Sequence, residues 1–277
     1  MSGKQITFDQ HFVPQCYLKN FTSNDWKVFA YNKNWQLLSK KYSPKSILFK
    51  NLLYELNLED PDNTIENFFS RIEDQYSILS KKLLSLKSPE DFNLTQEEQL
   101  VLLLFVLRLS FGNPSQYNNL NSKDFDELRM RELEANNLSE KDKKDSLEKL
   151  KEHNRKQLPI SIKVAFNTTF LTEFMLRKKF VFILTNEDNI FLTSDKPVIE
   201  RYDKSSWFFS PILTDTNYYV ALSPYICLKI IDKDLDINVS NLSICYDKNW
   251  EIGKKHNKLM FEYCKNYVYS NVKDFKL

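Results

Sequence analysis

Apolar residues recur every three or four positions in two segments of the N-terminal half. In the first segment, which begins at Asn63, they are Ile65, Phe68, Phe69, Ile72, Tyr76, Leu79 and Leu83. This spacing predicts an amphipathic helix, and Asn63 with Glu66 has the spacing of a capping box. In the second segment, Thr95 and Glu98 form another such pair ahead of a helix through Leu100–Phe111. Because apolar residues surround this second helix, we expect it to be buried.

Shorter stretches of aromatic and β-branched residues, with turn residues between them, predict strands. They form three candidate hairpins: Lys27–Asn32 with Gln36–Lys41, Phe180–Thr185 with Ile190–Thr193, and Asn217–Leu222 with Ile226–Ile231. Two of these pairs lie beyond residue 178, so we expect an antiparallel sheet in the C-terminal half. A last helix is predicted at about residues 239–264, and it runs into an aromatic tail, Tyr263–Tyr269.

The order of strands, helices, strands and a helix predicts an α+β fold, with a helical core packed against an antiparallel sheet. We expect a single domain over residues 1–277, because no flexible linker divides the chain. Residues 122–157 are mostly charged and helix-forming, which predicts a charged helical hairpin insertion. Interleaved acidic residues favour a solvated arm over a basic arm for nucleic acid. The same helical pair is a candidate surface for a protein partner or for self-association.

Composition and charge exclude several classes of protein. With 42% hydrophobic and 27% charged residues, the chain of 277 residues is far from the composition of disordered proteins. The net charge of +2 provides no broad positive field for nucleic acid or for an anionic membrane. The three glycines, Gly3, Gly112 and Gly253, cannot form a Rossmann fingerprint, a P-loop or a kinase glycine loop.

The cysteines and histidines form no metal-binding motif. The four cysteines stand far apart without a C-x-x-C pair, and the three histidines form no H-E-x-x-H, so we predict no metal site. The sequence leaves the cofactor open. The N-terminal segment lacks the basic start and apolar run of a secretory signal, and no stretch is long enough for a transmembrane helix. We therefore expect a cytoplasmic protein with reduced thiols and no membrane partner.

Arg108 is a charged residue inside the apolar run LVLLLFVLRLSF. Burying an unpaired guanidinium costs on the order of several kcal/mol, so its partner must be an acid, carbonyl groups or a bound anion. Its helical neighbours offer none of these, and the partner must come from another segment. Two interpretations stay open: a structural ion pair between helix and sheet, or a clamp for an anionic substrate.

The segment TSDKP, residues 193–197, directly follows a predicted strand. Short polar side chains before a proline form turns in which they satisfy their own backbone. Alternatively, the turn presents Asp195 at the end of the strand, where its carboxylate pairs with Arg108, binds a metal or acts as a base.

His11 and Gln15 lie four residues apart around Pro14. A histidine carries protons near neutral pH, and the amide of Gln15 could orient a substrate or a water molecule. The alternative is a structural histidine held by a hydrogen bond. Glu66 and Glu73 lie on one face of the first helix, either as a paired-carboxylate site or as a solvated, salt-bridged face.

The order of these segments resembles the bacterial family named domain of unknown function 4238. The resemblance spans about Phe8 to Ser270, through HFVPQCYLKNFT, NLLYE, TIENFFSRIED, IFLTSDKPVI, YVALSPYICLKI and NYVYS. Carried over position by position, the marks of the family fall on His11, Pro14, Gln15, Tyr17, Leu18, Glu66, Glu73, Arg108, Ser194, Asp195 and Pro197. Where such sequences often have Asn before this last proline, the chain has Lys196. The resemblance implies a stand-alone bacterial intracellular protein of the kind encoded in phage-defence loci.

We hypothesise that residues from three segments converge in one polar cleft suited to phosphodiester or nucleotide chemistry. The candidate catalytic residues are His11, Gln15 and Asp195, and the candidate substrate-binding residues are Arg108, Ser194 and Tyr17. The concrete form of this hypothesis is a defence-like or toxin-like nuclease acting on nucleic acid or a nucleotide. The alternative is a non-enzymatic binding or effector module of a phage-defence or toxin–antitoxin type system, in which the same residues are structural.

Overall fold

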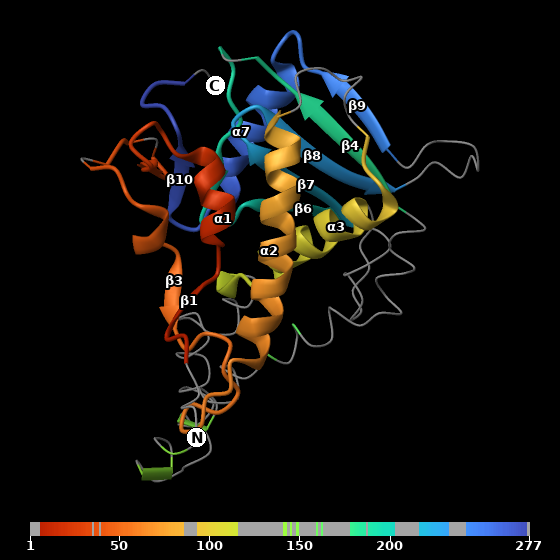
Figure 1. The fold of residues 1–277 in the computed structure, drawn as a ribbon. Coiled ribbons are helices and arrows are strands. Elements are labelled where there is room, and N and C mark those ends of the chain that lie inside the picture. The colour runs from red at the N-terminus through yellow and green to blue at the C-terminus, as the bar shows by residue number, and fades with distance from the viewer. Residues whose placement is uncertain are drawn as a thin grey trace.

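The computed structural model describes residues 6–34, 36–38, 40–85, 93–115, 178–186, 188–202, 216–232 and 242–275, with a few single positions between 141 and 162. Within these ranges, two long helices, α2 and α3, accompany a mostly antiparallel sheet (Figure 1). The α+β fold predicted from the sequence is therefore confirmed.

Helix α3 (Gln96–Phe111) begins at the predicted capping box and is buried as expected. Thr95 Oγ1 accepts the Glu98 N–H, and the Glu98 carboxylate accepts the Thr95 N–H. Its fully or almost fully buried residues include Leu102, Leu103, Phe105, Val106, Leu107, Arg108 and Leu109. The helix ends at Gly112, whose N–H donates to the Arg108 carbonyl oxygen.

Helix α2 (Thr64–Ser85) corresponds to the first helix predicted from the sequence. Its capping differs from the prediction, because the carboxylate of Asp62, one residue before Asn63, accepts the Thr64 N–H. The ring of Tyr76 on α2 stacks on Phe105 of α3, with centroids 3.4 Å apart, so the two helices share an aromatic contact. Three short turns precede α2, namely α1 (Gln15–Leu18) and the 3-10 turns η1 (Lys19–Phe21) and η2 (Pro44–Ser46).

The larger sheet has five strands in the order β6-β7-β8-β4-β9. These are β6 (Val198–Tyr202), β7 (Thr216–Ser223), β8 (Ile226–Asp232), β4 (Lys178–Leu184) and β9 (Leu242–Tyr246). All neighbours are antiparallel except β4 and β9, which are parallel. The predicted hairpin between Asn217–Leu222 and Ile226–Ile231 is confirmed as β7 and β8.

Two smaller sheets bring distant parts of the chain together. One pairs β1 (Asp9–His11) with β3 (Phe49–Asn51). The other has the order β2-β10-β5, from β2 (Phe29–Asn32), β10 (Tyr267–Ser270) and β5 (Thr193–Ser194). Strand β10 is thus the central strand of this sheet. It pairs with β2 from the N-terminal segment on one side and with β5, which directly precedes Asp195, on the other.

The predicted hairpin between Phe180–Thr185 and Ile190–Thr193 is wrong. The turn forms, with the Asn189 N–H donating to the Asn186 carbonyl, but β4 pairs with β8 and β9 and β5 pairs with β10. The segment between this turn and β5 is instead held by the side-chain amide of Asn257. Its oxygen accepts the Leu192 N–H, and its nitrogen donates to the Ile190 carbonyl oxygen. A buried side chain from a later helix therefore replaces the predicted strand partner.

Two other boundaries also differ from the predictions. The last predicted helix, residues 239–264, divides into strand β9 and helix α7 (Glu251–Tyr263), because the left-handed backbone of Trp250 separates them. In the first predicted hairpin, only β2 is a strand. The chain returns beside β2 through the isolated antiparallel bridges Tyr31–Leu37 and Val28–Tyr42, and the main partner of β2 is β10.

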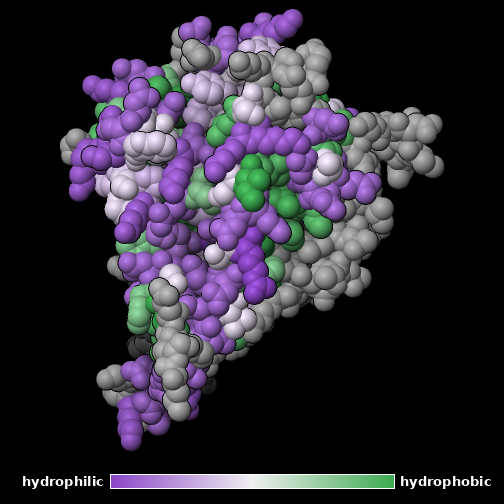
Figure 2. Space-filling view, in the orientation of Figure 1, coloured by the Kyte–Doolittle hydropathy of each residue, from purple (hydrophilic) through white to green (hydrophobic). Residues whose placement is uncertain are grey.

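The two faces of the sheet have different neighbours. On β6, the Glu200 side chain contacts Ser110 of α3, whereas the preceding Ile199 lines a cavity with residues of α7. Since consecutive strand residues point to opposite faces, α3 lies on one face and α7 on the other. Figure 2 views the side of the molecule on which α2 lies, where an apolar group interrupts a hydrophilic surface, and Ile78 on α2 and Leu100 on α3 are exposed.

Two predicted features lie outside the described residues. The charged segment 122–157 is described only at residues 141, 142, 145, 148 and 149, which are helical, so the predicted hairpin stays a prediction. The sequence also predicts a helix that starts at Pro159, a first-turn proline followed by apolar residues at helical spacing, and this helix is described only at residues 159 and 162. Among the described helices, none combines the length and the hydropathy needed to span a membrane.

Candidate functional site

Arg108 lies near the end of α3 and is 1% exposed. Its Nε donates to Glu73 Oε1 at 3.1 Å, and Nη2 lies 3.0 Å from the same oxygen. Nη2 also donates to the His11 carbonyl oxygen at 2.5 Å, and Nη1 donates to the Phe12 carbonyl oxygen at 3.3 Å. The guanidinium carbon lies 4.1 Å from the centroid of the Phe69 ring. We call this arrangement the Arg108 cage.

The cage agrees with the structural interpretation of Arg108, although its carboxylate comes from a helix and not from the sheet. The Tyr54 hydroxyl accepts from Arg108 Nη1 at 3.3 Å and donates to the Gly112 carbonyl at 2.7 Å. A Cβ at Gly112 would collide with Nη1 and with the Arg108 carbonyl, so the glycine makes room for the guanidinium. Protein acceptors therefore hold this cation, and it links α3, α2 and the N-terminal segment.

Two carboxyl groups on α2 have perturbed acidity beside the cage. Burial raises the pKa of Glu73, and the Arg108 charge opposes that increase. Burial also raises the pKa of Glu66 to about 7, again against the charge of Arg108. Glu66 Oε2 is buried, and no hydrogen bond to it is found in the part of the chain that the structure describes. Of the predicted carboxylate pair, Glu66 is thus the member that exchanges a proton near neutral pH.

His11 contributes its backbone carbonyl to the cage, and its imidazole lies elsewhere. The ring packs on Phe49 of β3 with centroids 5.3 Å apart, and Nε2 lies 3.3 Å from the Lys45 carbonyl oxygen. Burial lowers the pKa of the imidazole, the Lys45 carbonyl opposes this, and the Arg108 charge lowers it further. Gln15 begins α1 and is half-buried, and no side-chain hydrogen bond of Gln15 is found within the described ranges.

Tyr17 and Ser194 are fully buried. The Tyr17 hydroxyl donates to the Ala221 carbonyl at 2.6 Å and lies 2.8 Å from Thr193 Oγ1, and burial raises its pKa well above the usual value. Ser194 Oγ accepts the Lys196 N–H at 3.1 Å, which is the local turn expected for a hydroxyl before a proline. Both predicted substrate-binding side chains thus have partners within the fold.

Asp195 holds the turn that precedes β10. Its Oδ1 accepts the Lys265 N–H at 2.8 Å, and its Oδ2 accepts the N–H groups of Asn266 and Tyr267 at 2.7 and 3.2 Å. Its own carbonyl accepts from the Asn113 amide at 2.7 Å. Burial raises the pKa of Asp195, and the three N–H groups oppose this by stabilising the charged form.

The structure brings some of the predicted residues together and separates others. His11 and Arg108 meet through the His11 carbonyl, but the carboxylate partner of Arg108 is Glu73, and Asp195 is engaged by backbone N–H groups. The predicted pairing of Asp195 with Arg108 is therefore wrong. The catalytic roles assigned to His11, Gln15 and Asp195 stay predictions.

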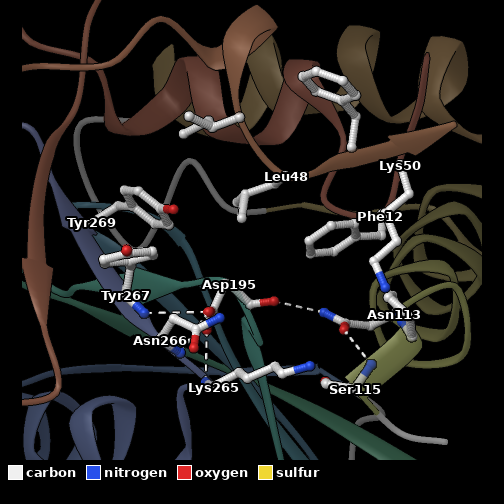
Figure 3. Close-up of a pocket in the computed structure, with 13 residues that line it drawn as sticks. Phe12, Leu48, Lys50, Asn113, Ser115, Asp195, Lys265, Asn266, Tyr267 and Tyr269 are labelled. Atoms are coloured by element: carbon white, nitrogen blue, oxygen red, sulfur yellow. Dashed lines mark hydrogen bonds between the residues drawn. The ribbon is translucent and has the colours of Figure 1, made fainter. Parts of the chain in front are cut away.

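Asp195 instead borders a pocket of about 260 Å³ between the N-terminal and C-terminal segments (Figure 3). The pocket is lined by side chains from the β1–β3 region, from the turn after α3 and from the segment around β10. Its apolar and aromatic residues are Phe12, Ile47, Leu48, Phe49, Pro114, Tyr267 and Tyr269, and its polar residues are Lys50, Asn113, Ser115, Asp195, Lys265 and Asn266. We call it the two-lysine pocket.

The two lysines give the pocket a positive charge. In Figure 3, Lys50 and Lys265 extend from different sides toward the Asn113–Ser115 segment. Partial burial lowers the pKa of Lys50, and the charge of Lys265 lowers it further. Neither ammonium group has a carboxylate partner within the described ranges.

Ser115 adds an unused hydrogen-bonding group to the pocket. Its hydroxyl is buried and has no hydrogen-bond partner among the residues that the structure describes, although its N–H donates to the Asn113 side chain at 3.0 Å. Buried hydroxyl groups are normally satisfied, so an orphan in a pocket wall indicates a position where a ligand or water is expected. A small anion with an aromatic or apolar portion matches this combination of groups.

Sequence reasoning did not identify Lys50, Lys265 or Ser115. Lys50 is one of many lysines, and only the pairing of β1 with β3 and the central position of β10 bring it near Lys265. The neighbouring motifs gave a partial signal, since Asp195 and the tail around Tyr267 and Tyr269 were both singled out. Because Lys50 and Lys265 are so far apart in the sequence, no local sequence motif indicates that they come together.

The four cysteines are free thiols. Cys227 Sγ lies 3.7 Å from His256 Nδ1, while His256 Nε2 lies 3.2 Å from the Leu192 carbonyl oxygen. Burial raises the pKa of Cys227 to about 12 and lowers that of His256 to about 4, so this pair is neutral and structural. Groups of three or more His, Cys, Asp and Glu side chains that could hold a metal ion do not occur among the described residues.

Comparison with known proteins assigns the chain to a family. The model of the family described as "Protein of unknown function (DUF4238)" matches residues 9–274, which is almost the whole chain. No curated protein and no solved structure matches the chain. The match extends from β1 to the segment beyond β10, and so includes every residue of the Arg108 cage and of the two-lysine pocket. The chain therefore belongs to the DUF4238 family.

Proposed function

We propose that the protein binds a nucleotide, or another small molecule that carries a phosphate group, in the two-lysine pocket. The observation that carries the proposal is the pair of lysines, Lys50 and Lys265, which line one pocket and form no ion pair among the described residues. The Asp195 carboxylate borders the same pocket, but three backbone N–H groups occupy it. A phosphate dianion between the two ammonium groups relieves their mutual repulsion and accepts charge-assisted hydrogen bonds from both. Binding therefore removes an unfavourable interaction as well as adding favourable ones.

The remaining pocket residues suit the rest of a nucleotide. The orphan hydroxyl of Ser115 can donate to a phosphate oxygen, and Asn266 offers an amide. The rings of Phe12, Tyr267 and Tyr269 provide apolar surface on which a planar base can stack. The alternative of a binding module is thus favoured over catalysis at the Arg108 cage, whose cation is already neutralised by Glu73.

A phosphodiester-cleaving enzyme, as a defence-like or toxin-like nuclease, is the second candidate. It is favoured by the position of His11, whose imidazole packs on Phe49, a residue of the pocket wall. The lowered pKa of this imidazole gives it a free lone pair at neutral pH, as a general base requires. We propose a cytoplasmic setting for either function, supported by the four free thiols, and phage defence as the biological context.

Thermal unfolding in the presence of ligands tests binding. We expect adenosine monophosphate, but not adenosine, to raise the Tm of the wild-type protein, because the phosphate supplies the contacts with both lysines. Lys265→Met and Ser115→Ala should each reduce the shift, and Lys258→Met, which removes an exposed lysine of α7, should leave it unchanged. Equal shifts with Lys265→Met and with the wild type would overturn the proposal. Loss of nucleic-acid cleavage in His11→Gln, with AMP binding intact, would support the nuclease.

A further inference from the structure

We infer that the side-chain amine of Lys50 is a nucleophile that forms an imine with a small phosphate-bearing aldehyde or ketone in the two-lysine pocket. The inference rests on the proposed function, since the phosphate group of such a compound occupies the same anion site. It adds a covalent activity that phosphate binding alone does not require.

The geometry places two amines in one shared space. Lys50 starts from strand β3 at the edge of the pocket, and Figure 3 shows its chain extending inward toward Asn113. Lys265 comes from the turn before β10 and points toward Ser115. Two ammonium groups without a carboxylate partner destabilise each other, so one of them loses its proton more readily than an ordinary lysine does.

Lys50 is the amine whose acidity is changed. Its pKa is lowered first by partial burial and second by the charge of Lys265. The other titratable groups that line the pocket are Asp195, Tyr267 and Tyr269. The Asp195 carboxylate is already occupied by three backbone N–H groups, and burial raises the pKa of Tyr269, so neither is arranged to keep Lys50 protonated. Lys50 is an exposed residue of β3 at the border of the pocket, and a lysine beside a second cationic group is a recognised form of activated amine.

The side chains that line the pocket favour formation of the imine. Phe12, Leu48 and Tyr269 offer apolar surface that limits water around a planar carbonyl compound. Within the described part of the chain, the buried hydroxyl of Ser115 has no hydrogen-bond partner, so we take it as a donor for a carbonyl or phosphate oxygen. In this arrangement, Lys265 holds the phosphate while Lys50 attacks.

The reaction balances without an oxidant or a reductant. The lone pair of Lys50 Nζ attacks the carbonyl carbon and a C–N bond forms, while the carbonyl electrons move to oxygen, which takes a proton. The resulting carbinolamine loses that oxygen as water. The nitrogen gives up its remaining proton, and a C=N bond is left.

Reductive trapping with an aromatic aldehyde tests the inference. The full-length protein is incubated with pyridoxal 5′-phosphate, reduced with borohydride and digested, and the labelled lysines are identified by mass spectrometry. We expect Lys50 to be labelled about tenfold faster than Lys258, a lysine of α7 that lies outside the pocket. Equal labelling of Lys50 and Lys258 would overturn the inference.

A second probe separates activation from phosphate anchoring. With pyridoxal, which lacks the phosphate, Lys265→Met should move the pH midpoint of Lys50 labelling upward, because the neighbouring charge is gone. Lys258→Met is the matched control and should leave the midpoint unchanged. An unchanged midpoint in Lys265→Met would contradict the role given to Lys265.

The outcomes also distinguish this inference from the proposed function. Inorganic phosphate, by bridging both ammonium groups, should protect Lys50 from either probe. If AMP raises the Tm but Lys50 is not labelled preferentially, the phosphate site stands and the imine does not. If Lys50 is labelled preferentially but phosphate gives no protection and AMP no shift, the activated amine stands and the proposed function fails.

Discussion

The Arg108 cage and the two-lysine pocket both contain cationic side chains, but they differ in whether other protein groups neutralise the positive charge. In the cage, a buried guanidinium finds a carboxylate, two carbonyls, a hydroxyl and an aromatic face within the protein. In the pocket, Lys50 and Lys265 border one space, and neither ammonium group has a carboxylate partner among the described residues. The comparison teaches that a charge whose partners within the fold are complete marks a structural site, whereas charges without such partners mark a candidate binding site.

The largest expected effect is on stability, at the cage. Glu73→Gln leaves Arg108 buried without its carboxylate, and we expect it to lower the free energy of unfolding by about 3 kcal/mol. Urea denaturation measures this loss. Asp25→Asn, which removes the exposed partner of Lys41, is the control and should cost much less, because solvent screens an exposed ion pair. Similar losses in the two variants would mean that the cage is not a structural ion pair.

Asp195→Asn should have an intermediate effect that reaches both stability and binding. The amide is a weaker acceptor for the three N–H groups of the 265–267 turn, so we expect a loss of about 2 kcal/mol in the free energy of unfolding. Hydrogen exchange of the Lys265, Asn266 and Tyr267 amides should speed up. Because this turn carries Lys265, AMP binding should weaken too, and unchanged exchange and binding would show that Asp195 does not hold the pocket.

A smaller effect is expected from pH, through Glu66. Its pKa in the folded state, about 7, lies above the ordinary value of 4.5, so the folded protein binds more protons than the unfolded chain between these values. The stability of the wild type should therefore fall as pH rises from about 5 to about 8. Glu66→Gln should flatten that dependence, as measured by urea denaturation at several pH values. An identical pH profile in Glu66→Gln would rule out Glu66 as the source.

The smallest effect on stability is expected in the pocket itself. Lys265→Met removes a charge that no carboxylate neutralises, so the free energy of unfolding should change by less than about 0.5 kcal/mol. Titration calorimetry should nevertheless show weaker AMP binding than in the wild type. If Lys265→Met lowered the free energy of unfolding as much as Glu73→Gln does, the pocket would be as important for stability as the cage, which would contradict the comparison.

Local patterns predicted the elements well, and long-range pairing was harder to predict. The capping box of Thr95 and Glu98 and the hairpin of β7 and β8 depend on neighbours in sequence, and both are confirmed. The partner of β5 depends on β10, some 70 residues later, and was assigned wrongly. Arg108 was recognised as needing a partner because a buried cation always does, but no spacing could point to Glu73.

The candidate site shows the same division. Asp195 was singled out from its turn, yet its function as an acceptor for three N–H groups required the contact with residues 265–267. Lys50 and Lys265 are ordinary surface lysines in a lysine-rich sequence, and only the folded arrangement makes them a pair.

A crystal structure of the protein with bound adenosine monophosphate tests the central claim most directly. We predict that the phosphate lies between the side chains of Lys50 and Lys265, within hydrogen-bond distance of the Ser115 hydroxyl, while the Arg108 cage stays closed around Glu73. A phosphate seated on Arg108 in place of Glu73, or a two-lysine pocket left empty at saturating nucleotide, would contradict the account.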